Sequence, residues 1–88
     1  MAKLVLYSGE VQGVGFRATA SWVAKRYPVR GWVRNLMDGR VELLVDGTDA
    51  AVAEFLADLR ERMAENITSE EITDRDPDHR LQGFFIVP

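Results

Sequence analysis

Three glycines and an arginine stand close together near the start of the chain, in the stretch GEVQGVGFR from Gly9 to Arg17. Glycines at 13 and 15 permit positive φ angles, at which successive backbone amides converge into a concave anion-binding nest. Arg17 would stand at the start of a helix, where free amides and the helix dipole add positive potential. The stretch could therefore hold a phosphate group. Its spacing alone also fits a plain strand-to-helix connection, and it matches neither GxxxxGK[ST] nor GxGxxG.

The order of apolar residues predicts the elements that must position these groups. Alternating or short continuous apolar stretches indicate strands, and apolar residues at three- and four-residue spacing indicate helices. Along the chain they predict strands over 3–7, 29–35, 41–46, 67–72 and 83–87 and helices over 16–27 and 52–63. Pro28 ends the first helix, Asp38-Gly39 forms a tight turn, and Thr48 is a helix N-cap.

This order, β-α-β-β-α-β with an extra C-terminal strand, is typical of an α+β, ferredoxin-like sandwich. Two helices then pack on one face of an antiparallel sheet. The first and second strands run parallel with the third between them, so the connections that follow them leave the sheet at the same edge. With strands about 4.8 Å apart, these connections should lie roughly 10 Å from each other. We therefore expect Arg17 and Asn35 to face one common pocket.

Composition and charge limit the class of protein. A chain of 88 residues allows a single domain, which we place at 1–88. No apolar run approaches the ~20 residues of a membrane span, and the N-terminus does not resemble a secretory signal. Cysteine is absent and the net charge is −3 without a basic stripe. We therefore expect a cytoplasmic monomer with no membrane or nucleic-acid partner.

Two stretches, YSGEVQGVGFR and GWVRNLMDGRV, resemble the two signatures of the acylphosphatase family, in the same order and at a suitable separation. The first signature reads approximately G-x-V-Q-G-V-x-F-R, which residues 9–17 match. The second reads approximately G-aromatic-V-x-N-x-x-D/x-G-x-V, which residues 31–41 match. The resemblance extends from Lys3 to about Phe55 and implies one acylphosphatase-like domain.

The resemblance implies hydrolysis of the carboxyl–phosphate bond of acyl phosphates to a carboxylate and inorganic phosphate, with no metal or cofactor. By position, it implies that Arg17 binds the phosphate and that Asn35 orients the attacking water. It also implies that phosphate oxygens are held by the backbone amides of Val11, Gln12, Gly13, Val14, Gly15 and Phe16. A small acyl phosphate would be the substrate, and inorganic phosphate the product and a competitive inhibitor.

The chemistry explains why such a site needs no histidine, cysteine or paired carboxylates. A carboxylate leaving group has a conjugate acid with a pKa of about 4, so no general acid is required. Phosphoryl transfer passes through a loose transition state, which leaves mainly positioning and charge stabilisation to the protein. We expect the proton of the attacking water to pass to a phosphate oxygen of the substrate.

Two other functions share parts of this pattern. RNA-recognition motifs have the same element order, but they display aromatic residues among basic groups on the middle strands. The strand VELLVDG instead presents Glu42 and Asp46. Acylphosphatase-like domains also occur at the start of large carbamoyl-transfer maturation proteins, where such a domain would serve only to bind an anion. The single domain and the absence of zinc-binding cysteines lead us to expect the stand-alone enzyme.

One segment, AENITSEEIT at 64–73, departs from the family, which commonly has a Gly-Pro-containing connection there. In the expected topology this connection returns to the edge of the sheet that carries the candidate site. It is therefore placed to shape the pocket around the acyl group of the substrate, and the sequence leaves its effect on the substrate range open.

Overall fold

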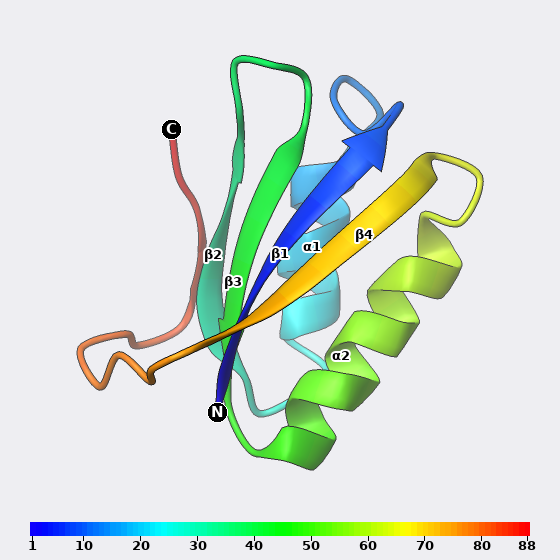
Figure 1. The fold of residues 1–88 in the computed structure, drawn as a ribbon. Coiled ribbons are helices and arrows are strands. Elements are labelled where there is room, and N and C mark those ends of the chain that lie inside the picture. Colours follow the sequence, from blue (N-terminus) through cyan, green and yellow to red (C-terminus); the bar gives the residue numbers. More distant parts are fainter.

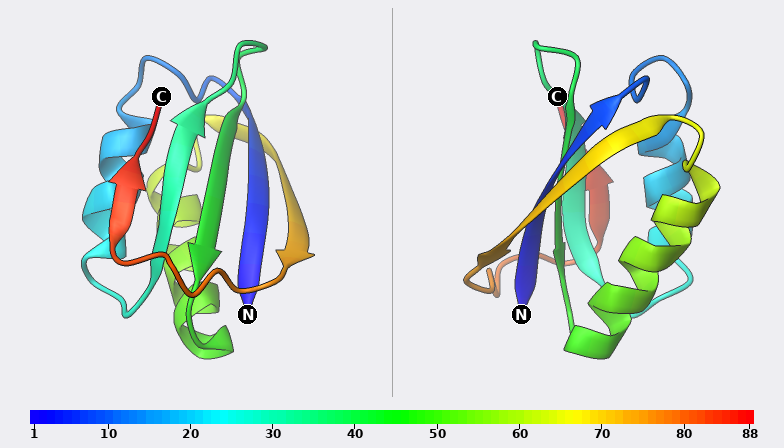
Figure 2. Two further views of the ribbon diagram at one scale, coloured as in Figure 1. Left: turned by 90° about the vertical axis from the view of Figure 1, so that its left-hand side faces the viewer. Right: turned by 45° about the vertical axis from the view of Figure 1, so that its right-hand side comes forward.

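The order of helices and strands follows the sequence prediction. The computed structural model describes residues 1–88, with β1 (Ala2–Gly9), α1 (Phe16–Ala24), β2 (Arg30–Asn35), β3 (Val41–Asp46), α2 (Asp49–Arg62), β4 (Ile67–Arg75) and β5 (Phe84–Ile86). Both helices lie on one face of a five-stranded sheet (Figures 1 and 2). The predicted α+β, ferredoxin-like fold is therefore confirmed. Neither helix is long and apolar enough to cross a bilayer.

The strand order, β4-β1-β3-β2-β5, places β3 between β1 and β2. β3 is antiparallel to both neighbours, so β1 and β2 run parallel and end at the same edge of the sheet. The loop after β1 and the turn after β2 both leave at this edge (Figure 1). This arrangement brings residues from two distant parts of the sequence to one end of the molecule.

The prediction of a wholly antiparallel sheet was wrong at one edge, because β5 pairs with β2 in parallel. The connection 76–83 crosses from one edge of the sheet to the other, so β5 enters from the same end as β2 (Figure 2). The apolar pattern predicts a strand but carries no information on its direction. The sheet is therefore mixed.

The two C-terminal strands differ in length from their predicted bounds. β4 continues beyond residue 72 to Arg75, with Lys3 of β1 opposite Asp74, whereas β5 is limited to Phe84–Ile86. The last residues of β4 are polar, so this part of the strand is held in the sheet by backbone pairing with β1 and not by the burial of alternating apolar side chains. Such pairing is not visible in the pattern of side chains.

The core lies between the sheet and the two helices. Its fully buried side chains include Phe16 and Val23 of α1, Phe55 and Leu59 of α2, and Leu43 of β3. Burying a side chain of this size contributes roughly 1.5–3 kcal/mol relative to leaving it exposed. The core therefore fixes the start of α1, at Phe16, against the sheet.

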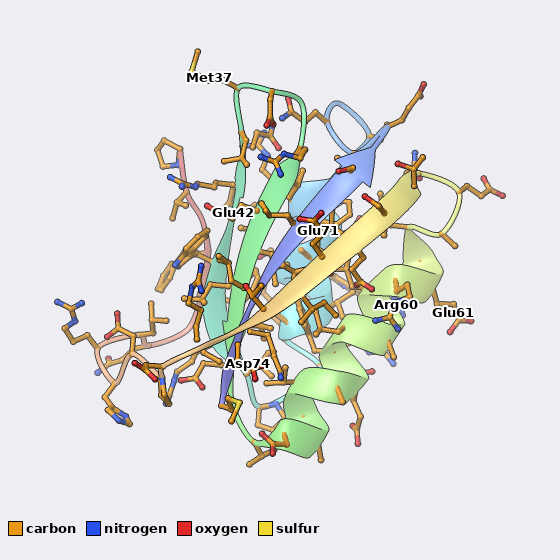
Figure 3. All side chains as sticks on the ribbon, in the orientation of Figure 1. Met37, Glu42, Arg60, Glu61, Glu71 and Asp74 are labelled. Carbon is orange, nitrogen blue, oxygen red and sulfur yellow. The ribbon has the colours of Figure 1, made fainter.

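The opposite face of the sheet is partly exposed and carries charged side chains, among them Glu42 and Glu71 (Figure 3). Glu42 forms an ion pair at 2.7 Å with Arg34 on the neighbouring strand. The middle strand of this face thus presents a carboxylate, whereas RNA-recognition motifs present aromatic rings there.

Candidate active site

The loop between β1 and α1 has a backbone shape that two glycines make possible. Gly13 and Gly15 have φ angles of 77° and 78°, in the left-handed region. A Cβ atom at either position would meet no atom within 4 Å. The requirement for glycine therefore comes from the backbone conformation, which costs other residues roughly 1–2 kcal/mol, and not from lack of space.

Five successive backbone amides of this loop, those of residues 11–15, have no partners within the protein. The Glu10 amide still donates to the carbonyl of Asn66 at 2.9 Å, but none of the amides of residues 11–15 donates a hydrogen bond. α1 then begins with Gly15 as its N-cap residue and with no side-chain cap. A helix leaves the amides of its first turn without intrahelical acceptors. Successive free donors therefore gather at the start of α1.

Gln12 fixes this loop to the turn that follows Asn35. Its side-chain Nε2 donates to the carbonyl oxygens of Leu36 and Arg40, at 2.7 and 2.9 Å. The same two residues close the turn, because the Leu36 amide donates to the Arg40 carbonyl at 2.8 Å. The Gln12 carboxamide therefore holds the loop and the turn in a set position relative to each other.

A cavity of about 230 Å³ lies at this end of the molecule. It is lined by Val11, Gly13, Gly15, Phe16, Arg17, Ala18, Asn35 and Ile86. The structure thus brings Arg17 and Asn35 to one cavity, together with four of the six loop residues that the sequence predicted. The other two, Gln12 and Val14, do not line it. The Gln12 side chain bonds instead to the turn after Asn35, and Val14 is exposed.

Arg17 differs from the other arginines in having no partner. Each of the others has a protein oxygen within ion-pair or hydrogen-bond distance, as in the Arg30–Asp46 pair at 2.8 Å. Arg17 is half-buried, and no carboxylate lines the cavity beside it. Its charge is therefore not neutralised within the protein, which favours an anionic ligand in the cavity.

The side chain of Asn35 is also unpaired. Its Oδ1 atom is buried and has no hydrogen-bond partner. Leaving a buried polar atom unsatisfied costs roughly 1–3 kcal/mol, and such atoms in folded proteins call for a specific explanation, such as a ligand or a water. Asn35 is the last residue of β2 and pairs with Val41 of β3, so its backbone is fixed by the sheet.

Two buried aromatic rings lie beneath the site. Phe16 packs against Tyr7 of β1 with ring centroids 4.8 Å apart, and both side chains are buried. Burial, followed by the nearby carboxylate of Glu70, raises the pKa of the Tyr7 phenol. Tyr7 therefore remains neutral and serves to hold the first residue of α1.

Two features of the cavity were not predicted from the sequence. Ile86 of β5 forms part of the wall, whereas no residue of 64–73 does. The connection before β4 returns to the same edge of the sheet as the site, but it contacts the chain just before the loop, at Gly9 and Glu10. The alternation in GFFIV indicated a strand, but only the strand order shows which neighbour it joins.

Comparison with known proteins agrees with this geometry. The family model for acylphosphatase matches residues 3–86. The chain belongs to the acylphosphatase family. An acylphosphatase of Haloarcula marismortui is 47% identical over 83 residues, covering 91% of this chain and 88% of the relative. An acylphosphatase of Bacillus velezensis is 38% identical over 81 residues, covering 91% and 87%.

Solved structures give the same result. The crystal structure of an acylphosphatase from Bacillus subtilis superposes with a TM-score of 0.86 at 30% identity, covering all of both chains. The family match also extends through β4 and β5, beyond the stretch up to Phe55 that carried the resemblance in the sequence. The chain is therefore an enzyme of the acylphosphatase family, and its family and fold support the hydrolysis of acyl phosphates.

Proposed function

We propose that the cavity between the 11–15 loop and Asn35 is the active site, where a positioned water attacks the phosphorus of an acyl phosphate. The observation that carries this proposal is the meeting of two unpaired groups in one cavity. Arg17 has no anionic partner, and Asn35 has a buried oxygen without a donor. A phosphate dianion with an attacking water supplies a partner to each.

Arg17 and the loop amides are proposed to bind the phosphate group. Free amides at a helix N-terminus favour an anion, and a guanidinium offers two parallel donors that match phosphate oxygens. The free donors of residues 11–15 would contact the remaining oxygens. Because these groups are already oriented, they can stabilise the charge of the transition state without reorganising, an effect worth several kcal/mol in comparable sites.

Asn35 is proposed to orient the attacking water. Its Oδ1 atom can accept a hydrogen bond from the water, which fixes an oxygen lone pair toward phosphorus. The bond from the water oxygen to phosphorus forms while the bond from phosphorus to the acyl oxygen breaks, and the electron pair leaves with the carboxylate. One proton of the water passes to a phosphate oxygen, so the protein needs neither a general base nor a general acid.

We further propose that residues 1–88 act as one domain and as a monomer in the cytoplasm. Small acyl phosphates are the proposed substrates, and inorganic phosphate is the proposed competitive inhibitor. These statements rest on the size of the chain, its lack of cysteine and the size of the cavity.

Hydrolysis of benzoyl phosphate, followed by its ultraviolet absorbance with a chelator present and no added metal, tests the proposal. We expect turnover that inorganic phosphate inhibits competitively. Binding of phosphate without turnover would indicate an anion-binding domain and would contradict the proposed function.

A further inference from the structure

β5 adds an apolar side chain to the wall of the cavity. Ile86 lies opposite Val33 of β2 in the parallel ladder, and the next amide, that of Val87, donates to the Val33 carbonyl at 2.9 Å. These contacts hold Ile86 beside the strand that carries Asn35. The Ile86 side chain nevertheless remains 47% exposed and lines the cavity.

The polar groups of the cavity are all used by the proposed chemistry. The free amides and Arg17 bind the phosphate, and Asn35 binds the water. The rest of the lining is apolar: Val11, Phe16, Ala18 and Ile86. Val11 and Phe16 are each 1% exposed, because they belong to the core, so they offer little surface to a ligand. Ile86 is the one large apolar side chain that the cavity exposes.

No second cation is available for a charged acyl group. Arg17 is the only charged residue of the lining. Arg40, on the nearby turn, is already paired with Asp38 at 2.8 Å. An acyl group with an additional carboxylate or phosphate would therefore find no partner of its own. An apolar acyl group, in contrast, would remove the exposed surface of Ile86 from water.

We propose that Ile86, together with the small Ala18, forms an acyl subsite that favours acyl phosphates with an apolar chain or an aromatic ring. This inference rests on the proposed function, since it concerns the part of the same substrate that the phosphate site does not hold. In this assignment β5 contacts the acyl group and so selects among substrates, while the 11–15 loop contacts the phosphate and Asn35 orients the water.

The test compares kcat/KM for benzoyl phosphate with kcat/KM for acetyl phosphate in the unmodified chain and in Ile86→Ala. The benzoyl ring has more apolar surface to lose than the acetyl methyl group. We expect the benzoyl-to-acetyl ratio to fall about five- to tenfold in Ile86→Ala, and by about two- to threefold in Ile86→Val. Each substrate is its own reference between variants, so intrinsic differences in reactivity cancel.

Phe85→Ala is the matched control. Phe85 precedes Ile86 in the same strand and is similarly exposed, at 52%, but neighbouring residues of a strand point to opposite faces of the sheet. Its truncation should leave the benzoyl-to-acetyl ratio unchanged even if it weakens β5. In Ile86→Ala, the inhibition constant of phosphate should shift less than twofold, because phosphate carries no acyl group.

An equal fall for both substrates in Ile86→Ala would assign Ile86 to the water or the phosphate rather than to the acyl group, and would overturn the subsite. An unchanged ratio would overturn it as well. If the unmodified chain hydrolysed neither substrate, the proposed function itself would fail, and the subsite with it. These three results are distinct in one set of assays.

Discussion

The two helices of this small fold begin in opposite ways. α2 has a conventional start: the side chain of Thr48 accepts a hydrogen bond from the Ala51 amide at 3.1 Å, and Asp49 places a negative charge in the first turn. α1 has Gly15 as its N-cap residue, with no side-chain cap and no acidic residue in its first turn. It has the unpaired Arg17 instead. The start of α2 is therefore satisfied by the protein itself, and the start of α1 is not.

This difference separates stability from function within one chain. A glycine at the N-cap, such as Gly15, gives up only a few tenths of a kcal/mol relative to a Ser, Thr, Asn or Asp cap, so the uncapped start of α1 costs little stability. In exchange, its free amides and its cation remain available to an external anion. A helix start with unsatisfied donors, positive φ angles and an unpaired cation therefore indicates a ligand site, whereas the same position in α2 indicates only a well-formed helix.

Removing the cation from α1 should have the largest effect. In Arg17→Gln, we expect kcat/KM for benzoyl phosphate to fall by about a thousandfold or more, with loss of inhibition by phosphate, because the main charge for the phosphate is gone. Thermal unfolding should change little, since Arg17 has no partner in the protein. Arg34→Gln, on the opposite face of the sheet, is the control and should retain its activity. Near-normal turnover in Arg17→Gln would refute the site.

Removing the group that faces the start of α1 should have the second-largest effect. We expect Asn35→Ala to lower kcat by about a hundredfold while inhibition by phosphate persists. Stability should be unchanged or slightly higher, because the substitution removes a buried oxygen without a partner. Steady-state kinetics with and without phosphate give both constants. If inhibition weakened in parallel with turnover, Asn35 would bind the phosphate rather than orient the water.

Changing the backbone at the start of α1 should have a smaller effect on activity. Gly15 has a φ of 78°, so Gly15→Ala imposes a strain of roughly 1–2 kcal/mol or shifts the loop. We expect a lower midpoint in urea unfolding and a fall in kcat/KM of about tenfold, as the amides move away from their set positions. A lower midpoint with unchanged kcat/KM would show that the loop amides do not contact the substrate.

Removing the cap of α2 should affect stability alone. Thr48→Ala deletes the hydrogen bond to the Ala51 amide, and we expect a loss of about 1 kcal/mol in the free energy of unfolding. The kcat/KM for benzoyl phosphate should stay within twofold of the unmodified chain, because Thr48 does not line the cavity. This variant and Gly15→Ala form a pair with similar losses of stability. Only the second should lose activity.

Much of the fold was accessible from the sequence because it depends on local patterns. Alternating apolar residues in 41–46 and apolar residues at helical spacing in α2 indicate which side chains are buried. The β-α-β-β-α-β order then limits the number of possible strand arrangements. The meeting of Arg17 and Asn35 followed from that topology without any contact being known. Thr48 was recognisable as a cap from its residue type and position.

What the sequence did not predict depends on contacts between distant segments. The parallel pairing of β5, and with it the place of Ile86 in the cavity wall, follows from the path of 76–83 across the sheet. The side-chain bonds of Gln12 to Leu36 and Arg40 also join residues far apart in the chain. No local pattern distinguishes a glutamine that makes such bonds from one exposed to solvent.

The Gln12 bonds have a consequence for motion at the site. Because one carboxamide holds both carbonyls that close the hairpin, the 11–15 loop and the hairpin should move as a single body. These segments are then ordered relative to each other when the chain folds. Substrate binding therefore has to supply little of the conformational entropy cost of ordering them. The proposed active site can thus keep a fixed geometry through the bonds of this one side chain.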